Sequence, residues 1–559
     1  MEKLRNIKKI ITRTAMIVFM ALICDNIQAD TNLVEIGETN GGNKLYAAEI
    51  KFNWNIVNAS INGNSNIMSL VMTKEADQQM PEPISYAMMF NFSDRSVLWN
   101  SGIKGKIKDT RTTCYGMLVT TSNDIRMLDI KDGTQKWTAE IYPAYIDDSL
   151  DVLIGYTSNS LKSSKLKAIK ASTGELLWEG KVKRNVSWGW DDAYKMDDGR
   201  IIVVGDDINV IDILTGDIKT FEAKTGYRET GKMALSILGS AALSVAVSAA
   251  LPSNTYVLYY RVAPDGSHMG FAGPNGFFFA GDYGPSILNG LSSNILKHDS
   301  YYYIADRDSL RCFSNDMQPI WQYAYPSKKA SASYLIAENG NIYMLNYGYG
   351  LSNGIWKRKN SRPFIASINA QTGEQTMFCA MKMKKDIIED SERTEDGLLY
   401  MFDDGMAYQK NINDTTIEII PWENKKYGKL KEFVRDTLYA VYEETGGFTP
   451  IVHEEGFFNV QTNKGYILKM DSKMNIITAY PEKDIYRQCF KQGKHIGIYR
   501  PSRKIGYDVW IVREQGFPEM HITQKVGAIG CTNDYVYIID ENTIRYFSLE
   551  NCIPGAKEQ

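Results

Sequence analysis

The sequence lacks the residue patterns that most metal and redox centres need. Its 559 residues contain no Cys-Cys dipeptide, no Cys-x-x-Cys pair and no haem-binding Cys-x-x-Cys-His motif. Zinc sites and redox-active thiol pairs require cysteines or histidines at close, defined spacing. The five histidines are instead isolated along the chain: His268, His298, His453, His495 and His521. We therefore predict no metal site and no cofactor.

An excess of charge of one sign is also missing. The chain has 63 Lys and Arg against 66 Asp and Glu, a net charge of −3, and no basic run follows its first thirteen residues. A protein that follows a phosphate backbone needs clustered basic residues, so nucleic-acid binding is not expected. There is no Gly-x-Ser-x-Gly elbow and no phosphate-binding loop, which argues against the corresponding hydrolases and nucleotide-binding proteins.

Tyrosine and glycine are abundant. The chain has 34 Tyr and 44 Gly, and 44% of its residues are hydrophobic, which is enough for a sizeable core. Aromatic residues favour strands, and glycine supplies the positive φ angles of tight turns. This composition predicts an all-β protein with many short strands.

The N-terminus has the charge order of a secretory signal. Five basic residues among the first thirteen precede an uncharged run from Thr14 to Cys24. Such a run is typical of a signal peptide and too short for a membrane anchor. Cleavage after Ala29 would remove residues 1–29. The alternatives are lipidation at Cys24, although the residue before it is not small, and an uncleaved anchor. We predict export, to the periplasm or the cell surface.

A repeat organises the rest of the chain. Residues 127–137 and 166–178 share an alternating apolar strand, a polar turn with glycine, and a second strand that ends in tryptophan. Further copies occupy residues 210–221 and 365–378. Period-2 alternation makes one face of a strand apolar, and a glycine fits the left-handed position of a hairpin turn. Physical constraints alone therefore account for the pattern.

The spacing of the repeat matches one propeller blade. Gly133 and Gly174 are 41 residues apart, and Gly174 and Gly216 are 42 apart. A four-stranded propeller blade uses roughly 40 to 45 residues. The 157 residues from Gly216 to Gly373 fit two or three further blades and an insertion. The spacing therefore predicts a β-propeller.

The order of a strand followed by Asp-x-x-Thr-Gly-x-x-x-Trp resembles the repeat of the pyrroloquinoline-quinone-like, or quinoprotein, β-propellers. This resemblance covers about a third of the chain and implies a ring of eight four-stranded blades. We accordingly predict a single propeller over residues 61–559. Residues 30–60 form an N-terminal segment and are expected to supply the strand that closes the ring.

The family that the repeat resembles includes quinone-dependent dehydrogenases and cofactor-free envelope scaffolds. Its dehydrogenases typically carry two adjacent cysteines against the quinone and a calcium site, and this chain has no adjacent cysteines. We therefore predict an exported, non-catalytic scaffold that binds an envelope protein or a surface glycan. The alternatives are a quinoprotein oxidoreductase and a carbohydrate-active enzyme. The paired carboxylates fit blade-edge turns better than acid/base pairs: Asp147-Asp148, Asp191-Asp192, Asp206-Asp207 and Asp403-Asp404.

Three aromatic, glycine-rich segments without a strand period are the candidate binding loops. Aromatic side chains in such loops supply rigid contact area for a protein or stacking faces for sugars. The alternative is that they pack over the ends of the ring. Residues 271–284 form one of the segments, and the other two contain the candidate residues Trp188, Trp190, Tyr347, Tyr349 and Trp356.

An apolar segment interrupts the repeats. Residues 233–251 carry no charge and are long enough to cross a membrane as a helix. Serine recurs there every fourth residue, from Ser236 to Ser248, a ladder that allows close helix packing. A single crossing is disfavoured, because repeats on both sides must close one ring. We expect an inserted helix that packs on the propeller. The alternatives are an element that contacts a membrane or a partner, and two half-rings that do not form one ring.

Overall fold

The computed structural model describes most of the chain after residue 31. The described ranges are 32–61, 66–74, 84–105, 107–121, 124–157, 164–182, 192–204, 207–223, 261–262, 268–269, 293–306, 308–326, 332–352, 356–359, 361–381, 387–394, 397–402, 404–412, 414–434, 437–442, 447–451, 456–502 and 506–552. The predicted signal peptide and the predicted helix at 233–251 lie outside them. Within these ranges, no helix combines the length and hydropathy that a membrane crossing needs.

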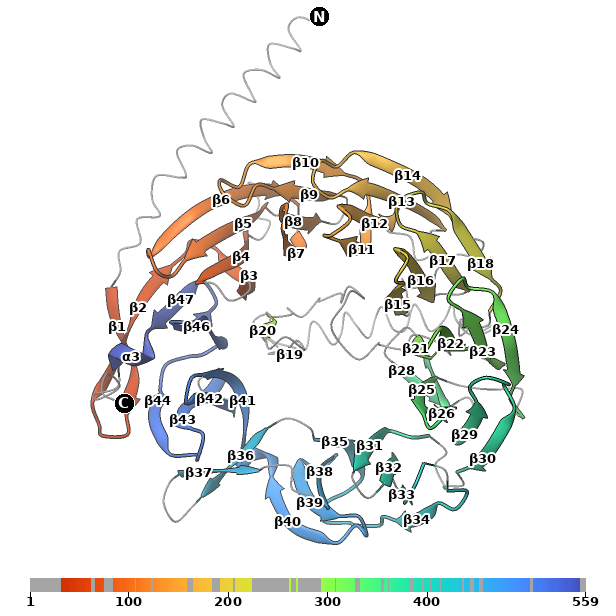
Figure 1. Ribbon diagram of the computed structural model, residues 1–559. Coiled ribbons are helices and arrows are strands. Elements are labelled where there is room, and N and C mark those ends of the chain that lie inside the picture. Colours follow the sequence, from red (N-terminus) through yellow and green to blue (C-terminus); the bar gives the residue numbers. More distant parts are fainter. Residues whose placement is uncertain are drawn as a thin grey trace, which may run out of the picture.

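Four-stranded antiparallel sheets make up most of the molecule, and together they form a ring (Figure 1). Four of them are β3–β6 (Asn55–Ile61, Ile67–Lys74, Ile84–Asn91, Ser96–Lys104), β7–β10 (Ile107–Thr113, Gly116–Thr121, Ile125–Leu128, Gln135–Ala139), β11–β14 (Tyr142–Asp147, Val152–Tyr156, Lys165–Lys170, Leu176–Lys181) and β15–β18 (Asp192–Lys195, Arg200–Val204, Ile208–Asp212, Ile218–Phe221).

Four more such sheets follow the segment with the apolar insertion. They are β21–β24 (Leu296–His298, Tyr301–Ala305, Ser309–Ser314, Pro319–Ala324), β25-β26-β29-β30 (Ser333–Glu338, Asn341–Asn346, Phe364–Asn369, Gln375–Ala380), β31–β34 (Asp390–Thr394, Gly397–Phe402, Gly405–Gln409, Glu418–Pro421) and β35-β38-β39-β40 (Leu430–Phe433, Phe457–Thr462, Tyr466–Asp471, Ile476–Pro481). Two small hairpin sheets pair β19 (Arg261–Val262) with β20 (His268–Met269) and β27 (Tyr349–Ser352) with β28 (Trp356–Lys359).

A composite sheet joins the two ends of the described chain. Its eleven strands run β37-β36-β41-β42-β43-β44-β1-β2-β47-β46-β45. They span Asn32–Thr39 (β1), Lys44–Lys51 (β2), Leu438–Tyr442 (β36), Gly447–Ile451 (β37), Ile485–Gln492 (β41), His495–Ser502 (β42), Gly506–Arg513 (β43), Pro518–Ile522 (β44), Ala528–Cys531 (β45), Val536–Asp540 (β46) and Thr543–Phe547 (β47). The N-terminal strand β2 pairs with the C-terminal strand β47, so strands from both ends close the ring.

The structure confirms the predicted all-β propeller. Eight four-stranded sheets stand as separate units within the described residues. The composite sheet adds two four-stranded meanders, β41–β44 and β45–β47 with β2, which β1 joins together. The clear repeats end at residue 378, so the sequence pattern does not predict this C-terminal elaboration.

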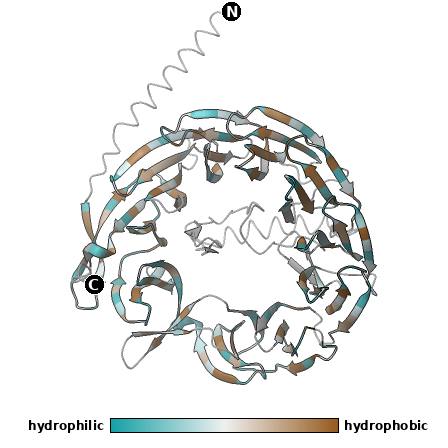
Figure 2. Cartoon of the chain, in the orientation of Figure 1, coloured by the Kyte–Doolittle hydropathy of each residue, from teal (hydrophilic) through white to brown (hydrophobic). Residues whose placement is uncertain are grey.

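The second strand is among the most buried strands of its sheet. Four of the five residues of β12 and of β16 are buried. Each of these strands is a nearly continuous apolar run, as expected for a strand covered on both faces. Figure 2 shows hydrophobic residues distributed along strands all round the ring rather than gathered at one centre.

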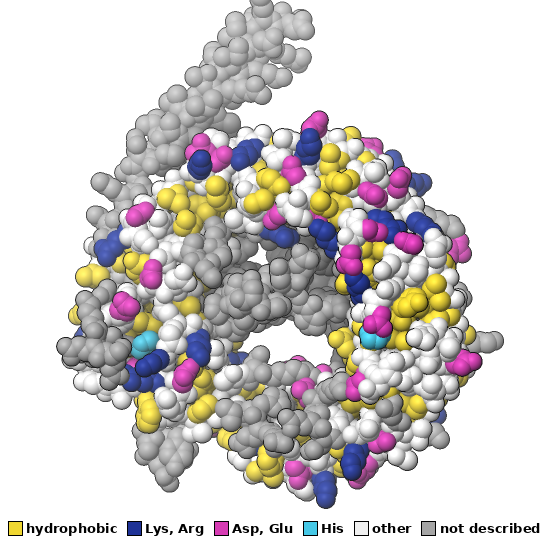
Figure 3. All heavy atoms as spheres, in the orientation of Figure 1, with side chains coloured by type: hydrophobic (Ala, Val, Ile, Leu, Met, Phe, Trp, Pro, Cys, Tyr) yellow, Lys and Arg dark blue, Asp and Glu magenta, His cyan; other side chains and the backbone are white. Residues whose placement is uncertain are grey.

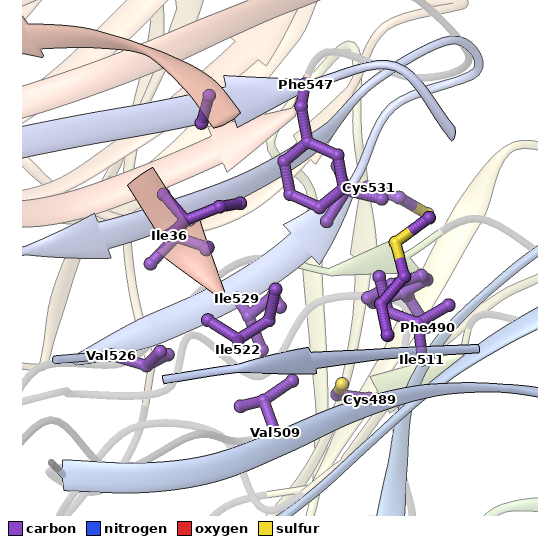
Figure 4. Close-up of a cluster of buried hydrophobic side chains, with 14 of the residues drawn as sticks. Ile36, Cys489, Phe490, Val509, Ile511, Ile522, Val526, Ile529, Cys531 and Phe547 are labelled. Atoms are coloured by element: carbon purple, nitrogen blue, oxygen red, sulfur yellow. The ribbon is translucent and has the colours of Figure 1, made fainter. Parts of the chain in front are cut away.

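The core is divided among the interfaces between neighbouring sheets. One cluster joins Leu118 and Met127 of β7–β10 to Leu153 and Ile169 of β11–β14. The composite sheet has its own cluster, in which Ile36 of β1 meets residues of β41–β47 (Figure 4). Figure 3 shows charged side chains of both signs across the presented face. Each sheet therefore depends on its neighbours, as expected for blades of a ring.

The repeat residues hold adjacent sheets together. The Trp137 indole of β10 lies against Gly174 in the turn of the next sheet and donates a hydrogen bond to the Ala171 carbonyl at 3.0 Å. The predicted left-handed turn glycine is confirmed, because Gly174 has φ +73°. The tryptophan thus packs between blades and not only within its own. The same arrangement joins Trp99 to Gly133, Trp178 to Gly216, and Trp321 to Gly373.

Candidate functional site

Strand register gives the ring two distinct faces. In the sheet β11–β14, Tyr142 pairs with Tyr156, and Lys165 pairs with Lys181. The start of the first strand, the end of the second, the start of the third and the end of the fourth therefore share one face. We call this the loop face and the opposite side the turn face. The long connections 182–191, 222–295 and 347–363 leave from the loop face, and the long connection 434–456, which carries the hairpin β36-β37, leaves from the turn face.

Many of the connections on the turn face are tight polar turns. Asp147 accepts hydrogen bonds from the Ser149 and Leu150 backbone N–H groups, both at 3.1 Å. Its other oxygen pairs with Lys195 of the next sheet at 2.5 Å. Asp147 therefore acts as a turn and inter-blade residue, as predicted for the paired carboxylates. Asp191, Asp206 and Asp403 lie outside the described residues.

Tyr347 and Tyr349 form an ordered aromatic pair on the loop face. Their rings stack with centroids 5.7 Å apart and an interplanar angle of 27°. The Tyr347 N–H donates to the Ala332 carbonyl at 3.0 Å, and the Ala332 N–H donates to the Tyr349 carbonyl at 2.8 Å. Gly348 between them has φ +80°. Both rings are half-buried, so the pair offers a fixed, partly exposed apolar surface.

The pair borders the next sheet. The Ile388 N–H donates to the Tyr347 carbonyl at 2.9 Å, which brings Glu389 and Asp390 close to the pair. Burial raises the pKa of the Tyr349 phenol above its ordinary value, and Tyr347 and the two carboxylates raise it further. Tyr349 therefore stays neutral near pH 7 and keeps its hydroxyl proton as a hydrogen-bond donor.

The other predicted site residues are less fully described. Trp356 begins β28 and pairs through its backbone with Ser352. The structure does not describe its side chain. Trp188 and Trp190 lie outside the described residues, in the connection between β14 and β15. Residues 271–284 lie outside them too. The structure thus brings Tyr347 and Tyr349 into contact and leaves the remaining three predictions untested.

Trp54 and Tyr86 form a second aromatic pair on the loop face. Trp54 lies between β2 and β3, and Tyr86 lies near the start of β5. Their rings are 3.9 Å apart with an interplanar angle of 11°. The sequence gives no local signal for this pair, because its members are 32 residues apart and only the sheet register brings them together.

A third cluster surrounds Asp508 on the meander β41–β44. The Asp508 carboxylate accepts hydrogen bonds from the Tyr486 hydroxyl at 2.6 Å and from Arg500 Nε at 3.0 Å. His521 Nε2 lies 2.9 Å from its other oxygen. The His521 ring stacks on Trp510 at 4.1 Å. The cluster comes from one strand end in each of four strands, all at the loop face.

The contacts of Asp508 determine its charge. Burial raises the pKa of this carboxyl, but the hydrogen bonds from His521, Tyr486 and Arg500 outweigh that effect and lower the pKa to about 2. The carboxylate is therefore ionised at neutral pH and committed to its neighbours. Within the described ranges, no three His, Cys, Asp or Glu side chains are grouped as a metal site would require. This arrangement holds four strand ends together and stabilises the loop face.

Comparison with known proteins gives structural likenesses only. No family model and no curated protein matches the sequence. BamB from Moraxella catarrhalis is 12% identical, with a TM-score of 0.31 over 79% of this chain and 96% of BamB. A eukaryotic initiation factor is 12% identical, with a TM-score of 0.33 over 79% and 96% of the two chains.

A computationally designed protein, Ika8, is 7% identical, with a TM-score of 0.29 over 74% of this chain and 97% of the design. At these scores the three likenesses carry no argument about function. The propeller fold rests on the strand pairing described above.

Proposed function

We propose that the protein is an exported, non-catalytic β-propeller scaffold that binds an envelope protein on its loop face. The observation that carries the proposal is the asymmetry of the ring. Three long connections leave from the loop face, where the stacked Tyr347 and Tyr349 lie, whereas one long connection, 434–456, leaves from the turn face. Partly exposed aromatic side chains on ordered backbone are typical anchors of protein interfaces.

The distribution of aromatic clusters favours a macromolecular partner. The Tyr347 pair and the Trp510–His521 stack of the Asp508 cluster belong to different sheets of the ring. A small ligand would be enclosed by one pocket, whereas a protein partner can contact several blades at once. Export follows from the N-terminal sequence pattern and remains part of the proposal.

The test is crosslinking and pull-down from intact cells that express the full chain. We expect a defined envelope protein to co-purify with the wild type, and its recovery to fall at least tenfold in the double variant Tyr347→Ala/Tyr349→Ala. The matched control is Phe517→Ala, which removes an aromatic side chain that is 66% exposed on the turn face. Equal recovery from both variants would contradict the loop-face assignment.

Two other outcomes would redirect the proposal. Saturable binding on a glycan panel that the double variant loses, without a protein partner, would make the Tyr347 pair a glycan site. Dye-linked alcohol oxidation after addition of the quinone and calcium would identify an oxidoreductase instead.

N-terminal sequencing tests the proposed export. We expect the exported protein to begin at Asp30, and a protein that begins at a lipidated Cys24 would contradict cleavage after Ala29.

A further inference from the structure

The connection that carries Trp54 is fixed from both sides. The Phe52 N–H donates to the Asn542 carbonyl, and the Asn542 side chain donates to the Phe52 carbonyl, both at 2.7 Å. The Ile56 N–H donates to the Glu541 carbonyl at 2.8 Å. The turn between β46 and β47 thus holds the backbone on either side of Trp54. A ligand that contacts Trp54 would therefore not have to order this backbone.

The Tyr86 ring lies between the Trp54 ring and strand β6. Tyr86 pairs with Gly102 of β6, and a Cβ atom at Gly102 would lie 3.3 Å from the Tyr86 ring. The absence of a side chain there lets the Tyr86 ring lie over the strand, while Trp54 stacks on it at 3.9 Å. Trp54 and Tyr86 are each half-buried. The result is a layered stack of strand backbone, phenol and indole.

The polar residues that flank Trp54 in the chain are uncharged. Asn53 and Asn55, on either side of Trp54, are both exposed. Side-chain amides both donate and accept hydrogen bonds. Glu541 lies in the turn between β46 and β47 that holds this segment. Its carboxylate is paired with Lys525 at 2.8 Å.

We propose that Trp54 and Tyr86 form a subsite for a neutral pyranose residue of a glycan. One face of a pyranose presents C–H groups, whose partial positive charge is attracted to the negative face of an aromatic ring. Its hydroxyl groups need neutral donors and acceptors nearby, and the exposed amides of Asn53 and Asn55 flank Trp54 in the chain. This subsite is separate from the Tyr347 pair and gives the scaffold a second kind of ligand.

Isothermal titration of the mature protein with cellotetraose, chitotetraose and maltotetraose tests the proposal. We expect saturable binding of at least one of the three, an affinity at least tenfold lower in Trp54→Ala, and an intermediate loss in Trp54→Phe. The control Tyr46→Ala, which removes a ring that is 49% exposed on β2, should bind as the wild type does. Gly102→Val should also weaken binding, because it keeps the Trp54 side chain but displaces the Tyr86 ring on which Trp54 stacks.

Circular dichroism and thermal unfolding show whether each variant is folded, and Trp54→Phe decides the result if Trp54→Ala is not. No binding of any of the three oligosaccharides at millimolar concentration would overturn the proposal. Equal oligosaccharide binding by a folded Trp54→Ala variant would overturn it too. So would a Trp54→Ala variant that loses capture of the protein partner but keeps oligosaccharide binding. Tyr347→Ala/Tyr349→Ala should retain saccharide binding, which keeps this result independent of the proposed partner.

Discussion

The Trp137 indole lies directly against Gly174 of the following sheet, where a Cβ atom would sit 2.7 Å from Trp137 Cγ. The indole N–H donates to the Ala171 carbonyl three residues before that glycine. The contact explains why the repeat requires both residues. The glycine gives the turn its positive φ and also leaves room for the tryptophan of the preceding blade.

Replacing Gly174 by alanine is therefore expected to destabilise the ring by about 2 to 5 kcal/mol. The estimate combines the cost of a left-handed L-residue, about 1 to 2 kcal/mol, with overpacking, about 1 to 3 kcal/mol. Gly340→Ala is the matched control, since Gly340 also has φ +73° but has no atom within 4 Å of the added Cβ. Urea unfolding should show the larger loss for Gly174→Ala. Equal losses would mean that the indole contact contributes nothing.

The sequence predicts the blades well because each blade is a local structure. Gly133, Gly174 and Gly216 mark hairpin turns whose residues are neighbours in the chain. A tryptophan follows the first two after four residues, and a phenylalanine follows the third after five. The composite sheet is different. The pairing of Gly37 with Ile522 in it joins strands almost the whole chain apart. No local pattern encodes such a pairing. The ring-closing strand expected in residues 30–60 follows from how propellers close in general, and neither its register nor the size of the composite sheet is predicted.

The candidate site shows the same division. Tyr347 and Tyr349 could be predicted because both belong to one aromatic, glycine-rich segment. Trp54 and Tyr86 come from different strands, and their contact depends on the register that pairs Tyr86 with Gly102. The loop face that three of the long connections share follows from the antiparallel order of four strands in each sheet. It could have been inferred from the repeat had every strand been assigned.

The Asp508 cluster predicts a specific acid sensitivity. Asp508 has an ordinary pKa of 3.8, which the folded protein lowers to about 2. A lowered folded-state pKa contributes stability above the unfolded pKa, and this contribution is lost as the pH falls from about 4 to about 2. The shift corresponds to about 2 kcal/mol at neutral pH.

We expect Asp508→Asn to be about 2 kcal/mol less stable than the wild type at pH 7, with the difference shrinking towards pH 2. The measurement is urea unfolding of both proteins across that pH range. Other carboxylates titrate equally in both proteins, so the comparison isolates Asp508. A difference that stays constant with pH would show that the carboxylate charge is not responsible.

Closure of the ring through β2 gives a further prediction. Ile50 is 2% exposed and pairs with Ile544 across the junction of the two chain ends. Ile50→Ala should therefore cost about 2 to 5 kcal/mol through lost burial and the cavity left behind. Leu33→Ala, at a β1 residue that is 71% exposed, should change stability by less than about 0.5 kcal/mol. Thermal unfolding of both variants checks this, and comparable effects would argue that the junction is not part of the cooperative unit.

The segment 233–251 gives the last prediction, which rests on its sequence. It belongs to the connection between β18 and β21, which are strands of separate sheets. Its apolar side chains would form a large exposed patch unless something covered them. If it packs as a helix on the propeller through its serines, Ser240→Leu should overfill a close contact and cost about 1 to 3 kcal/mol. We expect this loss in urea unfolding, with the parent protein in the soluble fraction. A parent in the membrane fraction, released by deletion of 233–251 and unaffected by Ser240→Leu, would instead place the segment in lipid.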